Sequence, residues 1–396
     1  MRNIIITGGE LFNKGAQAMV FITVDELKKR YPDHKIYLLS ELDLRRPKEE
    51  RDIYTFDFIG WYPIKFARAQ SNFFLRQMCK LRNSREYNEA YELYSNCDLM
   101  VDVSGYALGK SFSYETCSLY LDHLEYANEF DIPIYIMPQS FGPFDFSGEY
   151  ADELDDRIRR LLPTVKVICA REQEGLVELT ERYQLNNVVL KTDLVLNNKG
   201  IDISSVYNNV PSLENYQILD NSIAIIPNCM ITRVTDEKSV LLLYKDLIQY
   251  LVSIGHFIYI LSHSQSDSNL CKKIKKMFEN DNRVMQINKD FSCLEFNALV
   301  SKFRFIIASR FHSIVHAYKN GIPCISMGWA QKYQNLLNLF HQEVYAFDFR
   351  KSVSSSSLIK KTQLLEKNLD NEKRVISKVL SEIQSENVFD ILPEKL

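Results

Sequence analysis

The chain alternates between short runs of consecutive apolar residues and longer stretches in which apolar residues recur every three or four positions. Short continuous apolar runs are typical of strands buried on both faces of a parallel sheet, and the longer periodic stretches are typical of helices that cover such a sheet. We therefore expect an α/β protein with strands near 3–7, 35–40, 97–103, 134–137, 165–170 and 188–193, and again near 222–227, 256–261, 283–287, 303–308 and 324–327.

Residues 197–221 interrupt this alternation, because they are rich in Asn, Ser and Pro and only weakly periodic, which is typical of a linker. With 396 residues the chain is long enough for two hydrophobic cores. We predict two Rossmann-like parallel-sheet domains, residues 1–200 and 215–396, that face each other across a cleft. After the last strand, apolar residues at helical spacing between 358 and 383 predict two charged amphipathic helices that pack back on the body of the protein.

The most informative stretch is 302–332, which reads as a buried strand, a helix that ends at Asn320-Gly321, and a second buried strand. Arg310 and His312 follow the first strand directly, where open parallel sheets bind ligands. The start of the helix offers free N–H groups to an anion. Arg310 offers a planar guanidinium that can bind phosphate or carboxylate, and His312 can carry a proton. Lys332, beyond the second strand, could bring another positive charge to the same rim. The pattern predicts an anion site with a built-in acid.

Polar residues and glycines also follow several other predicted strands, and we expect them to line the same cleft because the carboxyl ends of parallel strands meet at one edge. These candidates are Asn13, Gly15, Gly105, Gln139, Ser140, Arg171 and His263. Two of them have alternative roles that the sequence leaves open. Arg171 could instead form a structural ion pair with Glu172 or Asp193, and His263 could act with Ser264 in capping a helix.

Composition narrows the class of protein. The net charge of −3 gives no general attraction for nucleic acid, and no apolar run approaches the ~20 residues that a membrane span needs. The first residues hold too short an apolar run for a signal-peptide core, so we expect a cytoplasmic protein. The eight cysteines contain no CxxC pair, which favours reduced thiols. His312 and His316 have the spacing of a zinc site but lack a glutamate between them and an evident third ligand, so we expect no metal.

Residues 61–85 differ from their surroundings, with six basic residues, five aromatic residues and no acidic residue. A helical insertion with solvated charges accounts for this composition. Peripheral contact with an anionic membrane surface would also account for it, and nucleic-acid binding is a third and weaker reading that the net charge does not favour.

Taken in order, these motifs resemble those of the polysaccharide pyruvyl transferases. The C-terminal signature of that family is similar to Ser309-Arg310-Phe311-His312, Gly-Ile-Pro at 321–323 and Lys332. Upstream, the resemblance extends to the Asn13-x-Gly15 loop, the loop at Gly105, Gln139-Ser140 before Gly-Pro, the pair Arg171-Glu172, and the polar loop with His263. The chain departs from the family pattern at Ala16 and Gln17, where an acidic residue is usual, and at Ser104 and Tyr106, where glycines are usual.

The resemblance implies two facing domains like those of the GT-B glycosyltransferases. It also implies transfer of pyruvate from phosphoenolpyruvate to a sugar of a polysaccharide or its lipid-linked precursor, as a ketal, with release of phosphate and without a cofactor. His312 would protonate the donor, and Arg310, Arg171 and Lys332 would hold its two anionic groups. Three alternatives remain: His312 only binds phosphate, the protein is a GT-B glycosyltransferase with a nucleotide-sugar donor, or it is a non-enzymatic subunit of an assembly complex.

Overall fold

The protein is described by a computed structural model that covers residues 2–60, 84–212 and 216–396. One prediction falls outside these ranges. The basic and aromatic stretch at 61–85 is not described except for residues 84 and 85, which begin helix α6 (Ser84–Ser95).

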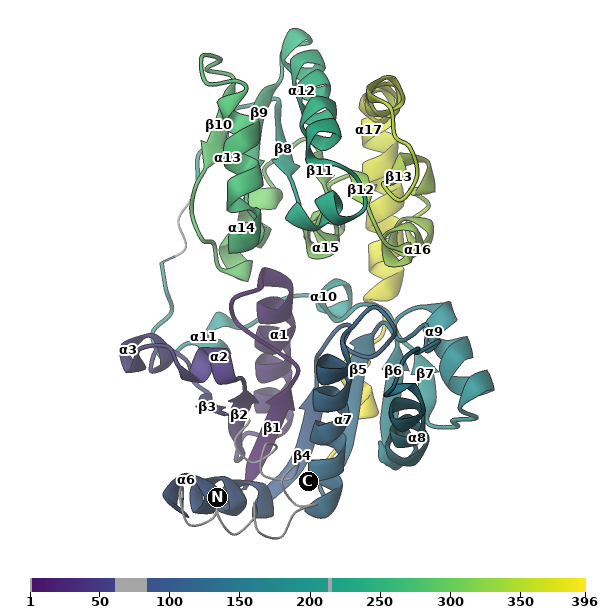
Figure 1. The fold of residues 1–396 in the computed structure, drawn as a ribbon. Helices are drawn as coiled ribbons and strands as arrows, with labels where there is room; N and C mark the ends of the chain where they lie inside the picture. Colours follow the sequence, from purple (N-terminus) through teal and green to yellow (C-terminus); the bar gives the residue numbers. More distant parts are fainter. Residues whose placement is uncertain (1, 61–83, 213–215) are drawn as a thin grey trace.

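The first domain is built on a sheet with the strand order β3-β2-β1-β4-β5-β6-β7 (Figure 1). Every strand pair described in it is parallel. The strands are β1 (Asn3–Thr7), β2 (Lys35–Leu39), β3 (Asp57–Ile59), β4 (Cys97–Asp102), β5 (Ile134–Gln139), β6 (Val167–Ala170) and β7 (Val188–Leu190). The helices are α1 (Lys14–Arg30), α2 (Glu41–Leu44), α3 (Lys48–Arg51), α6, α7 (Tyr114–Glu129), α8 (Ala151–Leu161) and α9 (Gln173–Val177).

The second domain contains a parallel sheet with the order β10-β9-β8-β11-β12-β13. Its strands are β8 (Ser222–Ile226), β9 (Phe257–Leu261), β10 (Val284–Ile287), β11 (Ile306–Ala308), β12 (Cys324–Gly328) and β13 (Ala346–Asp348). Its main helices are α12 (Glu237–Ser253), α13 (Ser268–Lys276), α14 (Cys293–Val300), α15 (Phe311–Lys319) and α16 (Gln331–Leu339). The predicted pair of parallel-sheet α/β domains is confirmed. The apolar runs 4–6 and 223–226 are completely buried, as expected for strands covered on both faces.

Each sheet has one point at which the strand order reverses, between β1 and β4 in the first domain and between β8 and β11 in the second. Open α/β sheets form a ligand-binding crevice at this point, outside the carboxyl ends of the strands. Figure 1 shows that the two sheets lie on opposite sides of a single interface, with the start of α1 between the domains. The fold therefore brings two such crevices to a single interface.

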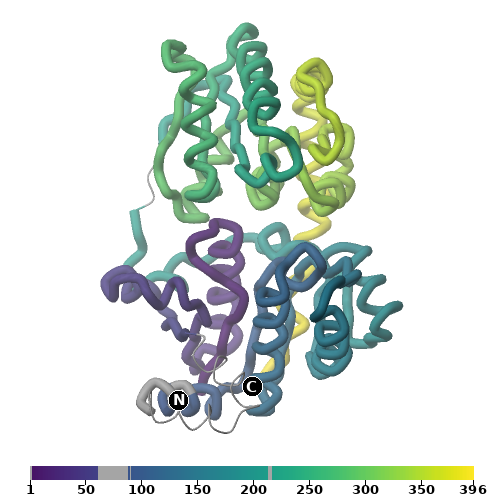
Figure 2. Tube along the Cα trace, viewed as in Figure 1, coloured from purple at the N-terminus to yellow at the C-terminus, as the bar shows by residue number. Residues whose placement is uncertain are grey.

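The predicted linker at 197–221 is partly ordered structure of the first domain. It includes helix α11 (Ile203–Val206), and Tyr207 forms an isolated antiparallel bridge with Tyr54. The Tyr207 ring also packs edge-on against Phe21, at 5.5 Å between ring centroids. The chain then passes to the second domain beyond α11 and returns after the last long helix (Figure 2).

The prediction of two C-terminal helices is wrong, because a single helix, α17 (Ser355–Ile383), runs for 29 residues. Its sequence contains no Gly or Pro, so nothing in the backbone interrupts the helix. The tail that follows crosses to the first domain, where Arg30 pairs with Asp390 at 2.8 Å and Lys191 with Glu386 at 2.9 Å. The helix packs back as expected, but its continuation ties the C-terminus to the N-terminal domain.

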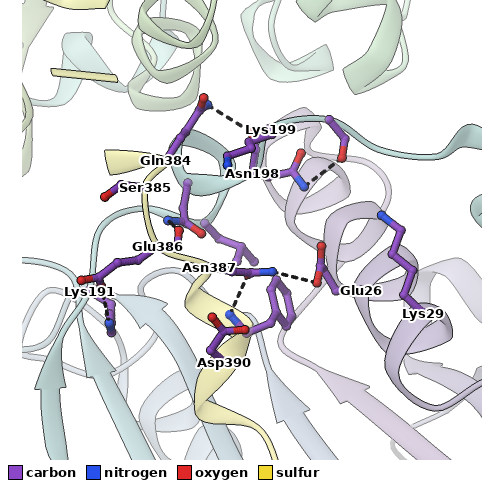
Figure 3. A pocket seen from close by; sticks show the side chains of 14 residues that line it. Glu26, Lys29, Lys191, Asn198, Lys199, Gln384, Ser385, Glu386, Asn387 and Asp390 are labelled. Carbon is purple, nitrogen blue, oxygen red and sulfur yellow. Dashed lines mark hydrogen bonds and ion pairs between the residues drawn. The ribbon is translucent and has the colours of Figure 1, made fainter. Parts of the chain in front are cut away.

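The buried side chain of Asn197, at the end of α10 (Leu194–Asn197), fixes this tail. Its Nδ2 donates to the carbonyls of Ile383 and Glu386, at 3.0 and 2.8 Å, and its Oδ1 accepts from the N–H of Val388 at 2.9 Å. A cavity of about 570 Å³ lies beside this anchor (Figure 3). Its walls come from α1, from the segment after β7 and from the tail, and they contain none of the predicted site residues.

None of the helices in the described parts of the chain is both long enough and apolar enough to cross a lipid bilayer.

We predict that Asn197→Ala lowers the stability of the folded protein by at least about 2 kcal/mol, because it leaves two carbonyls and one N–H of the tail without a partner. Thermal unfolding followed by circular dichroism measures this. Asn96→Ala is the control, since the Asn96 side chain is exposed and bonds only within its own helix region. Equal shifts in the two variants would contradict the role of Asn197 as the anchor of the tail.

Candidate active site

The start of α1 and the start of α15 meet at the interface of the two domains. A Cβ atom placed on Gly15 would lie only 2.2 Å from Nδ1 and 2.3 Å from Cγ of His312. Asn13 caps α1 by accepting a hydrogen bond from the Gly15 N–H at 3.1 Å. The structure thus brings Asn13 and Gly15 of the first domain together with His312 of the second. Glycine is required at position 15 because the imidazole ring lies directly against the backbone.

The His312 side chain is enclosed, and among the described residues its Nε2 has no hydrogen-bond partner. Burial lowers the pKa of His312 to about 4; Asp193 opposes this shift, while Arg171 and Lys332 add to it. The imidazole is therefore neutral at pH 7 in the free protein. This pKa lies below the ordinary value of a histidine, because a buried ring without a bonded carboxylate is harder to charge.

Lys332, at the start of α16, lies beside the Phe311 ring on one side of this site. Its Nζ lies 5.3 Å from the centre of the Phe311 ring and 5.4 Å from that of Tyr106, which belongs to the first domain. Burial lowers the pKa of Lys332 to about 8, and the positive charge of Arg171 acts in the same direction. No carboxylate within the described residues pairs with the ammonium group. Lys332 therefore offers a cation at the cleft that no carboxylate binds directly, although Glu172 and Asp193 lie near enough to stabilise its charge.

Arg171 follows β6, and each of its three side-chain nitrogens already has a partner. Its Nε pairs with Glu172 and its Nη1 with Asp193, each at 2.9 Å, and its Nη2 donates to the Ser140 hydroxyl at 2.6 Å. The structural ion pair considered in the sequence is thus present with both candidate partners at once. The guanidinium also stacks on the Phe311 ring, 4.5 Å from its centre. Arg171 adds positive potential to the site while its hydrogen-bonding groups hold the surrounding loops.

Gln139 and Ser140, at the end of β5, are buried parts of the same arrangement. Gln139 donates from Nε2 to the Tyr120 hydroxyl at 2.6 Å, and its Oε1 has no partner among the described residues. Ser140 donates to Glu172 at 2.9 Å. The two side chains order the loop around Arg171.

A second group of basic residues lies around the polar loop of the second domain, which contains His263 and follows β9. Arg310 binds Asp267 through Nε and Nη2, at 2.8 and 2.7 Å, and Nη2 also donates to the Ser266 hydroxyl. His263 is buried nearby, and neither of its ring nitrogens has a partner among the described residues, so it does not cap through Ser264. Lys14 reaches over from the first domain and pairs with Asp290 at 2.9 Å.

His316 extends this group one helical turn beyond His312. Its Nδ1 is 3.1 Å from Oδ1 of Asn297, whereas its Nε2 is buried without a partner in the described chain. The Phe296 ring lies between His316 and His263, at 5.6 and 4.9 Å between ring centroids. Burial holds the pKa values of His263 and His316 well below the ordinary range. No group of three metal-binding side chains that could hold a metal ion occurs in the described ranges.

Gly105 lies in the first domain's crevice with φ +68°, in contact with the side chain of Met19. Asp102, the last residue of β4, was not predicted to belong to the site. Its carboxylate accepts bonds from the hydroxyls of Thr7 and Ser104, each at 2.9 Å, and burial raises its pKa to about 6. Asp102 therefore joins the loops after β1 and β4 at the point where the strand order reverses.

Sequence reasoning also missed Lys14, Tyr106 and Asp290 as members of the site, whereas Asp193 was considered as a partner of Arg171. Lys14 stands between Asn13 and Gly15 and could have been included with that motif. Tyr106 and Asp290 carry no local signal, because their contacts with Lys332 and Lys14 form only when the two domains dock.

A cavity of about 300 Å³ opens beside Phe311 and Lys332. Both domains line it, and a hydrogen bond of 3.0 Å from Asn335 to Glu174 joins its two sides. Its remaining walls are mainly leucines and amide side chains, namely Gln173, Leu190, Leu196, Leu336, Asn338 and Leu339. This cavity gives a small organic molecule a route from the surface to the cations of the site.

Comparisons with known proteins agree with this architecture. The family model described as polysaccharide pyruvyl transferase matches residues 13–331. Solved structures with a similar fold include the UDP-GlcNAc 2-epimerase from Methanocaldococcus jannaschii, at 12% identity and TM-score 0.57, covering 92% of each chain. A glycosyltransferase from Rickettsia africae is similar at 13% identity and TM-score 0.55, covering 98% of this chain and 95% of its own. S. aureus MnaA, solved with UDP, matches at 11% identity and TM-score 0.55, over 98% and 92% of the two chains.

At these identities the structural neighbours, GT-B glycosyltransferases and UDP-GlcNAc 2-epimerases, establish the fold alone. They confirm the predicted GT-B-like pair of domains. None of the curated proteins matches the sequence significantly.

We predict that Gly15→Ala destabilises the protein by roughly 1–3 kcal/mol, because the added methyl group would overlap the His312 ring and force the domains apart. Gly200→Ala is the matched control, since a Cβ there meets nothing within 4 Å. Chemical denaturation of both variants measures the difference. If Gly15→Ala were as stable as Gly200→Ala, the observed contact between α1 and the imidazole would not exist in solution.

We also predict that the His312 ring of the free protein titrates near pH 4, as an NMR titration of the imidazole carbon-bound protons would measure. An unfolded histidine takes up its proton near pH 6.5, whereas the folded ring does so only near pH 4. The protein should therefore lose stability as the pH falls through this window. A midpoint at or above 6.5 would show that the ring is not desolvated as described.

Proposed function

The chain belongs to the polysaccharide pyruvyl transferase family, and we propose that it transfers pyruvate from phosphoenolpyruvate to a sugar of a polysaccharide or of its lipid-linked precursor. The product is a ketal that bridges two hydroxyl groups, and inorganic phosphate is released. The observation that carries this proposal is the position of His312, whose ring adjoins two separate groups of basic residues.

The two groups suit a donor with two anionic ends. Lys332 and Arg171 form one group, joined by the Phe311 ring. Arg310, His263 and Lys14 form the other, around the polar loop that follows β9. Phosphoenolpyruvate carries a carboxylate and a phosphate on C2, and its C3 methylene is the atom that must gain a proton. A donor held by both groups would present this carbon to the imidazole between them.

The chemical steps follow from this placement. The imidazolium of His312 gives a proton to C3, so that C3 becomes a methyl group and C2 becomes electrophilic. A sugar hydroxyl attacks C2 and loses its proton. The bond from C2 to the phosphate oxygen breaks, and the phosphate leaves with the electron pair. The neighbouring hydroxyl then attacks the same carbon and closes the ketal. In sum, one hydroxyl proton replaces the proton taken by C3, and the other leaves with the phosphate.

The lowered pKa of His312 fits this scheme. In the free protein the ring is neutral at pH 7. A bound carboxylate and phosphate place negative charge beside the ring, and negative charge raises the pKa of an imidazole. Binding of the donor would in this way favour protonation of the His312 imidazole, which then acts as the acid. Arg310 would hold the donor in position.

The acceptor sugar has a route through the cavity beside Phe311, whose walls carry amide groups that can bond to hydroxyls. Asn13, Gly105, Gln139 and Ser140 would shape the first-domain side, the last two through Arg171 and Tyr120. Peripheral contact with an anionic membrane through residues 61–85, at the cytoplasmic face, remains a prediction that the described residues do not address.

One competing function is favoured by the fold, namely glycosyl transfer from a nucleotide sugar, since glycosyltransferases share this architecture. The experiment that separates the two supplies phosphoenolpyruvate with a panel of free and lipid-linked glycans, and measures released phosphate and product mass. We expect phosphate only when an acceptor is present, with a product heavier by one pyruvate ketal. Transfer from a nucleotide sugar without consumption of phosphoenolpyruvate would support the competing function.

We predict that His312→Asn lowers the rate of phosphate release at least about 100-fold, because it removes the proton donor while keeping a polar side chain. His341→Asn is the matched control, since His341 is exposed and its left-handed backbone, with φ +56°, suits asparagine. An equal rate in the two variants would exclude His312 as the acid.

A further inference from the structure

Four buried ring nitrogens close to the interface lack hydrogen-bond partners within the described residues. They are both nitrogens of His263 and the Nε2 atoms of His312 and His316. A buried polar atom without a partner costs roughly 1–3 kcal/mol. So many in one cluster therefore indicate a bound group that supplies missing hydrogen-bond partners.

The groups around His263 are held together by one loop and two carboxylates. Lys14 donates to Oδ1 of Asp290 at 2.9 Å, and Gln265 donates to its Oδ2 at 3.0 Å. Two residues along the same loop, Asp267 binds Arg310 through both carboxylate oxygens. His263 lies in the same loop, two residues before Gln265, and the positive charges of Lys14 and Arg310 both act on it. Basic groups from both domains thus gather around one unsatisfied imidazole.

We propose that Lys14, His263 and Arg310 form the subsite for the phosphate of the donor, and that Lys14 supplies its cation from the N-terminal domain. This inference rests on the proposed function. It adds the orientation of the donor, that is, which group of basic residues binds its phosphate and which binds its carboxylate. Asp290 holds Lys14 in the absence of the anion. Its side chain is 54% exposed, so it can turn to solvent when a phosphate oxygen takes its place.

The other group of basic residues suits the carboxylate. The donor groups Nε, Nη1 and Nη2 of Arg171 are all bonded to neighbouring side chains, which leaves Lys332 as the available cation there. The ammonium group of Lys332 lies near two aromatic rings, those of Tyr106 and Phe311, which leave few other hydrogen-bond donors beside it. A carboxylate carries one charge and needs few donors, whereas a phosphate dianion accepts from several, as the cluster around His263 offers.

The subsite also links the donor to the contact between domains. The ring nitrogens are buried, and Gly15 of α1 lies directly against the His312 ring. In this proposal an anion reaches the nitrogens when the two domains separate. Once bound, it contacts Lys14 from one domain and Arg310 from the other. Donor phosphate would therefore draw the domains together on both sides of the His312 ring.

Inorganic phosphate tests this without turnover, because its binding can be measured by titration calorimetry in the absence of acceptor. We expect Lys14→Met and His263→Gln each to weaken phosphate binding about tenfold or more, since each removes a hydrogen bond to a charged group. Lys332→Met should weaken phosphate binding less than Lys14→Met does. Lys273→Met, which removes an exposed cation paired with Glu237, is the control for a general loss of positive charge.

Asp290→Asn separates a binding role of Lys14 from a structural one. If Lys14 and Asp290 only join the domains, then Lys14→Met and Asp290→Asn should both weaken phosphate binding through loss of the same bridge. If Lys14 binds phosphate, then Asp290→Asn removes its competitor, and phosphate should bind about threefold to tenfold more tightly. Because Asp290 is half exposed, this variant is expected to fold, and it decides the question even if Lys14→Met does not.

Two results would overturn the inference: unchanged phosphate affinity in Lys14→Met, or a loss in Lys332→Met that exceeds the loss in Lys14→Met. Either can occur while the wild-type protein still releases phosphate from phosphoenolpyruvate, in which case only the direction of the donor is wrong. A wild-type protein that binds phosphate as described but consumes no phosphoenolpyruvate with any acceptor would instead contradict the proposed function.

Discussion

The close approach of the His312 ring to the backbone of Gly15 sets how the two domains meet. The start of α1 can lie against α15 only because residue 15 has no side chain. Bonds on both sides of this contact keep the same register, with Lys14 paired to Asp290 and the Gln17 side chain accepting from the Cys293 N–H at 2.6 Å. The site therefore exists only where the domains touch, although Arg171 and Arg310 are each held by carboxylates of their own domain.

The same contact explains the electrostatics. The imidazoles and Lys332 are enclosed among other basic groups, while the nearby carboxylates of Asp267 and Asp193 are bound to arginines. Burial, together with repulsion from neighbouring cations, lowers the pKa values of His263, His312, His316 and Lys332. A dianionic ligand would bring negative charge to these groups and raise their pKa values again. In this account ligand binding, protonation of the acid and domain contact are one coupled event.

Much of the fold could be predicted from the sequence, because the central strands are buried on both faces and so are continuously apolar. The edge strands β3 and β13 were missed, since each has three residues, mostly half-buried or exposed, and no apolar run. The number of helices after residue 355 was wrong because a polar stretch within an amphipathic helix looks like a break, although it contains no helix-breaking residue. The passage of the tail to the first domain depends on Asn197, which no local pattern marks.

For the site, the motif at 309–312 was correctly placed after a strand, at the reversal of strand order. What the sequence could not tell is which cations are already neutralised. Arg171 and Arg310 are both paired with carboxylates, whereas Lys332 has no carboxylate partner in the described chain. Such differences arise from side chains that are distant in sequence, and the role of Lys14 arises only from docking between domains.

A crystal structure of the protein with phosphoenolpyruvate, in the absence of acceptor, tests the central claim most directly. The account predicts that the donor lies between the two domains, with its methylene carbon against the His312 ring, its phosphate toward Lys14 and Arg310, and its carboxylate toward Lys332. A donor bound away from the His312 ring and the Arg310 guanidinium, for example in the cavity beside the C-terminal tail, would contradict it.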